Sequence, residues 1–205
     1  MAYCGVDELK EYLGVTGATD DPMLLTLLAA AQRTIDSYCA RTFEAEADTV
    51  RTFESQRDVD GYTLTVDSDL CAITSIVNGD GTTISNSHYV TEPRNETPYY
   101  AIRLKASAGK AWTATVAGDS ENAITITGKW AYSTSAPSDI AHVCKRLAAY
   151  IYRQKDNAGD LDRAVIAGNS TILPAQIPSD IRLMLAPYRR SEEHTSELQS
   201  RRAIS

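Results

Sequence analysis

Apolar residues recur at helical spacing over residues 6–13, 24–38 and 140–151 of the chain. Residues that suit helix ends flank each of these stripes. The end signals are Gly14 after the first stripe, Asp20 and Pro22 before the second, and Pro137, Ser138 and Asp139 before the third. The pattern therefore predicts two N-terminal helices, the second ending near residue 40, and a third helix after residue 137 that residues 157–160 should end. A short last helix is expected over residues 178–185.

The middle of the chain has a different period. Apolar and polar residues alternate over residues 49–54, 62–66 and 124–127, which is typical of half-buried strands. Residues 73–84 contain two strand-like runs around a glycine-rich turn and predict a β-hairpin. The predicted fold class is α+β, with a helical core and an inserted, mostly antiparallel β-rich region. In this division residues 1–47 and 133–189 form the helical core, and residues 48–132 form the insertion.

The last stretch of the sequence, residues 190–205, resembles the translation of a common sequencing-library adapter. We interpret it as an assembly artefact, expect it to be disordered and exclude it from the fold. On this interpretation the native C-terminal residues would be missing.

Composition narrows the functional classes. The chain has 205 residues, which suits one domain or a domain with an insertion, and its net charge of −7 disfavours tight DNA binding over a broad surface. No apolar run is long enough to span a bilayer, and a secretory signal is not expected. The cysteines are widely spaced, which indicates free buried thiols rather than a zinc site or a redox motif. They are Cys4, Cys39, Cys71 and Cys144.

Residues that could support catalysis or bind a metal are present but form no motif. His88 and His142 are the histidines before residue 190, and neither lies in a recognisable catalytic pattern. Carboxylates cluster in the sequence of the β-rich region, where turns and loop solvation explain them better than a metal or acid–base site does. These are Asp58, Asp60, Asp67, Asp69 and Asp80. We therefore predict no enzyme activity, no catalytic residues, no metal and no cofactor.

A modest basic stretch lies among aromatic residues. It contains Arg94, Arg103, Lys105 and Lys110, close in sequence to Tyr99, Tyr100 and Trp112. Such a mixture can bind nucleic acid or form a protein interface. Because the chain has no basic surplus, the interface is the favoured interpretation.

The order and spacing of these segments resemble the head–tail connector proteins of tailed phages, of the head–tail adaptor or head completion type. The resemblance runs from about residue 3 to residue 154, and more loosely to residue 185. The matching segments are residues 7–14, 20–43, 67–82, 89–99, 124–133 and 137–154. Gly5 stands where this family usually has Thr or Ser at the first helix cap, a position at which glycine is tolerated.

The resemblance implies a structural virion protein of the phage neck. Such proteins form a ring, commonly of twelve subunits, below the portal, and the ring joins the head to the tail and continues the DNA channel. The expected partners are the portal protein, a tail or neck protein and further copies of the chain, with DNA passing through without sequence-specific binding. Assembly would occur in the host bacterial cytoplasm, and no membrane partner is expected.

Three other classes stay open. One is a tail-completion or neck protein, another is a monomeric β-rich binding module, and the third is a small hydrolase, which would need a pocket that joins a histidine to an acid and a nucleophile. The module would present an exposed aromatic row drawn from Tyr62, Tyr89, Tyr99, Tyr100 and Trp112.

Overall fold

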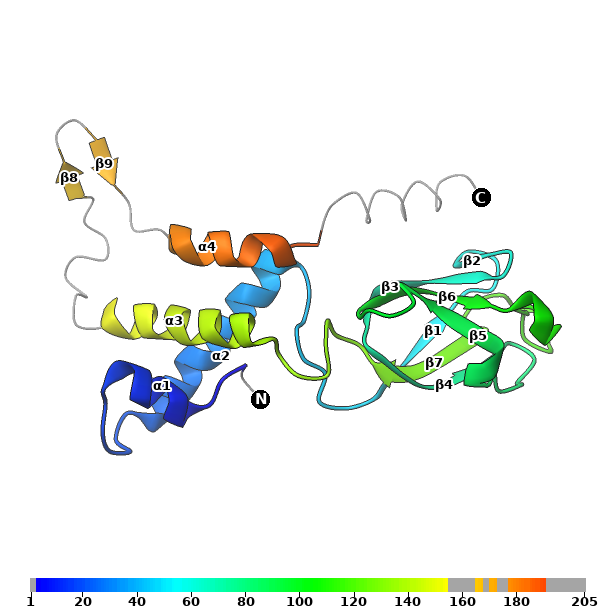
Figure 1. The fold of residues 1–205 in the computed structure, drawn as a ribbon, viewed down its shortest axis with the longest axis horizontal. Coiled ribbons are helices and arrows are strands. Elements are labelled where there is room, and N and C mark those ends of the chain that lie inside the picture. Colours follow the sequence, from blue (N-terminus) through cyan, green and yellow to red (C-terminus); the bar gives the residue numbers. More distant parts are fainter. Residues whose placement is uncertain (1–2, 155–164, 168–169, 173–176, 191–205) are drawn as a thin grey trace. The chain divides into compact units, whose positions relative to one another are not determined.

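The computed structural model describes residues 3–154, 165–167, 170–172 and 177–190. The chain divides into two compact units, which we describe separately. The helical unit combines residues before 41 with residues 137–189, and the β unit contains residues 41–136. Helices and antiparallel sheets occupy different parts of the chain, which confirms the predicted α+β class (Figure 1).

Four α-helices are described in the helical unit. They are α1 (Val6–Leu13), α2 (Asp21–Cys39), α3 (Ser138–Gln154) and α4 (Ser179–Leu185). A short 3-10 helix, Ala186–Tyr188, follows α4, and the two-stranded hairpin β8 (Val165–Ala167) and β9 (Ser170–Ile172) precedes it. The predicted helices are thus confirmed, whereas the helix break expected at residues 157–160 lies outside the described residues.

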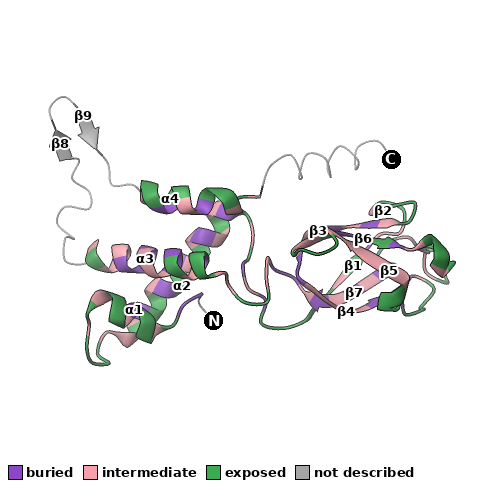
Figure 2. Ribbon diagram, viewed as in Figure 1, coloured by how far each residue is buried: buried purple, intermediate pink, exposed green. Residues whose placement is uncertain are grey.

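The buried faces of the helices follow the apolar stripes of the sequence (Figure 2). Leu24, Leu28 and Ile35 of α2 are fully buried, as are Ile140 and Leu147 of α3. Because α2 and α3 pack against each other, these side chains form one core that Leu9 of α1 and Leu185 of α4 complete.

The helix ends are only partly as predicted. Gly14 ends α1 in the left-handed conformation, with φ of 72°, where a residue without a Cβ is favoured. Asp20 does precede α2, but its carboxylate makes no capping hydrogen bond. The carboxylate accepts a hydrogen bond of 2.9 Å from the Tyr152 hydroxyl instead. Asp20 therefore occupies the predicted N-cap position, but its side chain does not cap the helix.

The β unit contains two antiparallel sheets. One has the order β1–β7–β4, and the other has the order β2–β3–β6–β5. The strands are β1 (Thr49–Phe53), β2 (Val59–Asp60), β3 (Thr63–Leu70), β4 (Ala72–Val77), β5 (Tyr89–Glu92), β6 (Tyr99–Leu104) and β7 (Ile124–Lys129). The chain passes from one sheet to the other at the buried residue Cys71, whose N–H donates to the Lys129 carbonyl at 2.9 Å.

The inner faces of the two sheets share one apolar core. Leu64 and Ile102 come from one sheet, and Ile76, Ile124 and Ile126 come from the other; all five side chains are fully buried. The alternation that predicted these strands therefore reflects one face packed inward and one face turned to solvent.

The predicted hairpin over residues 73–84 is only half correct. The turn forms, because the Asn78 N–H donates to the Thr82 carbonyl at 2.8 Å. The second arm is a single bridge between Val77 and Thr83 rather than a strand, and β4 pairs along its length with β7. The arm ends early because Ile84 turns into the core and Ser85 then caps the short 3-10 helix Asn86–His88.

Candidate functional site

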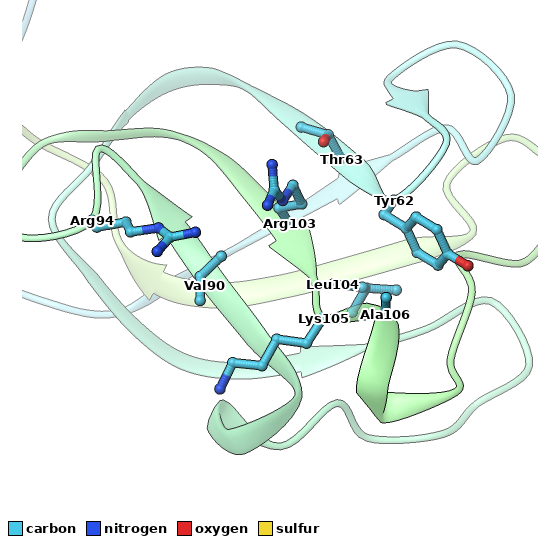
Figure 3. A pocket seen from close by; sticks show the side chains of 8 residues that line it. All are labelled: Tyr62, Thr63, Val90, Arg94, Arg103, Leu104, Lys105 and Ala106. Carbon is cyan, nitrogen blue, oxygen red and sulfur yellow. The ribbon is translucent and has the colours of Figure 1, made fainter.

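A hollow of the β unit lies over β3, β5 and β6. We call it the cationic hollow, and its volume is about 470 Å³. Its lining residues are Tyr62, Thr63, Val90, Arg94, Arg103, Leu104, Lys105 and Ala106 (Figure 3). Strand pairing builds its floor, because Arg103 on β6 pairs with Thr63 on one side and with Val90 on the other. These three residues stand on the face of the sheet opposite the core residues Leu64 and Ile102.

Positive charge is in excess in the hollow. The Arg103 guanidinium lies 3.7 Å from the Glu92 carboxylate, and both side chains are partly exposed. Lys105 donates to the Ser87 carbonyl at 2.8 Å, and it has no acidic counter-ion among the described residues. Arg94 is exposed and forms no ion pair with a described residue. Three cations therefore share one carboxylate, which gives a site suited to anionic groups.

The basic and aromatic residues singled out from the sequence do not form one site. Arg94, Arg103 and Lys105 come together, but Lys110 is not among the lining residues. Trp112 is buried and donates its indole N–H to the Tyr62 carbonyl at 2.9 Å. The alternation of β6 could have placed Arg103 outward, whereas Thr63 and Val90 are found only through strand pairing.

The aromatic candidates for a binding module are also separated. Tyr62 and Tyr100 are exposed by about half, whereas Tyr89 and Tyr99 pack against the core. Burial raises the pKa of the Tyr89 hydroxyl, as expected for a ring held among apolar neighbours. With Trp112 buried, the five residues do not make an exposed row.

His88 and His142, the histidines before residue 190, belong to different units. His88 ends a 3-10 helix beside β5, and its Nδ1 is buried without a hydrogen-bond partner among the described residues. His142 is exposed on α3.

Four of the five clustered carboxylates make local interactions. Asp67 pairs with Arg51 at 2.8 Å, and Asp69 lies 3.4 Å from the Arg41 side chain. The Asp58 carboxylate accepts the Glu54 N–H at 2.9 Å. Hydrogen bonds from the hydroxyl and backbone of Thr82 lower the pKa of Asp80. Within the described ranges, no three His, Cys, Asp or Glu side chains are placed to hold a metal ion.

The cysteines are free and buried, as the sequence predicts. A hydrogen bond with Cys4, followed by burial, raises the pKa of the Cys144 thiol far above its ordinary value. Burial likewise raises the pKa of Cys71. Both thiols are therefore held in the neutral form, which is a poor nucleophile.

The helical unit presents a contrasting acidic surface on α1. Asp7, Glu8 and Glu11 are all exposed on this eight-residue helix, beside Tyr12, which is 44% exposed. Lys10, the one base of α1, is already paired with Asp21 at 2.8 Å. We call Asp7, Glu8, Glu11 and Tyr12 the α1 acidic face.

A second, smaller hollow of about 270 Å³ lies between α1, α3 and α4. Arg146 and Arg153 of α3, Tyr12 and Tyr150 line it, together with residues at the start of α4. Arg146 forms an ion pair there with Asp180, and this pair links α3 to α4.

The fold and these surfaces define an α+β protein whose described residues form a cationic hollow on one unit and an acidic helix face on the other. The family model for head completion proteins matches residues 3–191, and the chain belongs to this family. No curated protein matches the chain. The family has a structural role in the virion, at the neck between the head and the tail.

Two solved structures share the fold. One chain is described as "Neck of empty GTA particle computed with C6 symmetry", with a TM-score of 0.56 and 18% sequence identity. The other comes from "Virion of native gene transfer agent (GTA) particle", with a TM-score of 0.56 and 19% identity. Each alignment covers 92% of this chain and 90% of the other. Among the described residues, no helix is both long and apolar enough to cross a membrane.

Proposed function

We propose that this protein forms a closed ring below the portal, joins the phage head to the tail and continues the channel through which DNA passes. The observation that carries the proposal is the match of the head completion family over residues 3–191. The likeness to a chain from the neck of a gene transfer agent particle supports it through the shared fold.

Symmetry is compatible with the expected ring of twelve. The neck of the gene transfer agent particle was computed with C6 symmetry. A ring of twelve equivalent subunits contains a six-fold axis, and so does a ring of six. The symmetry does not separate these two numbers. The proposal keeps twelve, the number that the family resemblance implies, and a mass measurement can distinguish it from six.

Each contact in such a ring is heterologous, because one face of a subunit meets a different face of the next. We propose that the helical region, residues 1–47 and 133–189, forms the ring core and that the β-rich region, residues 48–132, projects from it. The acidic balance of the chain suits a channel wall, because a wall that binds phosphates weakly lets DNA slide. The partners in this proposal are the portal protein and a tail or neck protein, and assembly takes place in the host cytoplasm.

The test is a particle made without this protein. A stop codon early in its gene should yield filled heads that lack tails and lose DNA, and supplying the protein in trans should restore complete particles. Electron microscopy of both preparations provides the readout. Tailed, infectious particles from the stop-codon genome would contradict the proposal. Tails that detach from stable, full heads would favour a tail-completion protein instead.

A further inference from the structure

We propose that the cationic hollow receives the α1 acidic face of a second copy of this chain, and that this pairing is a subunit contact of the ring. The inference rests on the proposed ring, whose contacts it specifies. It assigns one half of a heterologous interface to the β unit and the other half to the helical unit. Every subunit carries both halves, so each can give one and receive one.

The charges of the hollow are available for a partner. Arg94 makes no ion pair with a described residue, and the ion pair of Arg103 with Glu92 is long, at 3.7 Å. Cations held close together repel one another, so an incoming carboxylate stabilises the arrangement. Val90, which is half-buried on the same face as Arg103, adds apolar surface against which an aromatic ring or an alkyl stem can pack.

The α1 acidic face has matching properties. Asp7 and Glu11 lie one turn apart on the helix, and neither makes an ion pair with a described residue. Like charges at this spacing destabilise a helix, and Glu11 lies near the C-terminal end, where the helix dipole also disfavours an acid. Only Asp7 and Glu8, in the first turn, suit the dipole. A cation from outside the unit compensates for both unfavourable effects.

A second copy fits the hollow better than DNA does. Residues 41–136 contain more acids than bases, so the surroundings of the hollow repel a polyanion that extends beyond it. A single helix turn with two carboxylates presents its charge over a short span, within the screening length of about 8 Å at physiological salt. Exposed Tyr12 on the acidic face and exposed Tyr62 at the rim of the hollow are residue types that interfaces favour.

Charge reversal on each half tests the pairing. The variants are Arg94→Glu with Arg103→Glu, Asp7→Lys with Glu11→Lys, and all four changes together. Arg57→Glu with Lys110→Glu is the matched control, because it changes the charge of the β unit equally outside the hollow. Ring assembly of the full chain, with portal protein present, is measured by mass photometry at 0.15 M and 1 M salt.

Each double reversal should weaken subunit association at 0.15 M salt by at least about tenfold, whereas the control should match the parent. The combination of all four changes should restore association to within about threefold of the parent. Arg94→Glu alone should give a smaller loss, and it keeps the test valid if Arg103→Glu disturbs the sheet. Circular dichroism melts verify that each variant is folded.

Several outcomes would overturn the pairing. These are double reversals that assemble as the parent does, a quadruple variant that shows no recovery, or a hollow variant that loses only duplex DNA binding. If the parent forms rings on the portal while the reversals have no effect, the ring proposal survives and the pairing fails. If the parent never forms rings on the portal, the proposed function itself fails.

Discussion

Asn78 holds a loop of the β unit in place, and its substitution gives the most quantitative stability prediction. Its side chain is 3% exposed and is the one buried polar side chain among the described residues. The amide donates to the Ala111 carbonyl at 3.0 Å and accepts the Thr113 N–H at 3.1 Å. The neighbouring Gly79 shows how close the loop lies, because an added Cβ would stand 2.1 Å from the Thr113 carbonyl oxygen.

Asn78→Ala removes both hydrogen bonds and leaves a carbonyl and an N–H without partners. Each unsatisfied buried group costs about 1–3 kcal/mol, so the free energy of unfolding should fall by about 2–6 kcal/mol. Asn95→Ala, at an exposed position, should change it by less than about 0.5 kcal/mol. Urea unfolding followed by tryptophan fluorescence reports on the β unit, because both tryptophans, Trp112 and Trp130, lie in it.

Asn78→Asp separates the two bonds. A carboxylate can still accept from Thr113 but cannot donate to Ala111, and it faces a carbonyl oxygen. Burial should raise the pKa of this new carboxyl above the unfolded value of about 3.9. The protonated acid can donate, so the variant should match the parent best below that pH and lose stability as pH rises through the folded pKa. A cost under about 1 kcal/mol for Asn78→Ala, or no pH dependence of the Asp variant relative to the parent, would refute this reasoning.

Three further stability predictions follow from the same contacts. Gly128→Ala places a Cβ 2.2 Å from the Ala72 carbonyl oxygen between β4 and β7, so the free energy of unfolding should fall by about 1–3 kcal/mol in the same urea titration, with Asn95→Ala again as the control. Burial raises the pKa of Asp36, which accepts a hydrogen bond from Tyr3, so the ionisation of this carboxyl opposes folding as pH rises. Asp36→Asn should therefore raise the melting temperature at pH 7 but not at pH 3, and equal gains at both pH values would contradict this prediction. Leu185→Ala should lower the free energy of unfolding by about 2–5 kcal/mol, because this side chain is fully buried. Cutting the chain after Arg189 should leave the thermal melt of the helices, monitored by circular dichroism, unchanged. A lower melting temperature after the cut would show that residues 190–205 contribute to the fold.

The elements that the sequence predicted best are those whose signal is local. The helical stripes that include Leu24, Leu28 and Ile140 identified α2 and α3, because a helix buries a face set by its own period. The ends were predicted less well, since Asp20 has the residue type of a cap but is used by the distant Tyr152. Choices between a local and a distant partner depend on tertiary packing.

The arrangement of the strands could not be predicted from alternation. Nothing local indicates that Cys71 passes from one sheet to the other, or that β4 pairs with β7, which lies about fifty residues away. The cationic hollow was also only partly predictable, because it depends on strand pairing. The sequence identified Arg94, Arg103 and Lys105 as a basic stretch, and only the pairing of β6 with β3 and β5 showed that Thr63 and Val90 complete the hollow.

The proposed ring is tested most directly by the mass of the complex that this chain forms with the portal protein of its own particle. The measurement compares the chain cut after Arg189, alone and mixed with assembled portal. A closed complex whose added mass equals twelve subunits, either in solution or only on the portal, is the predicted result. A chain that stays monomeric and leaves the portal mass unchanged would contradict it.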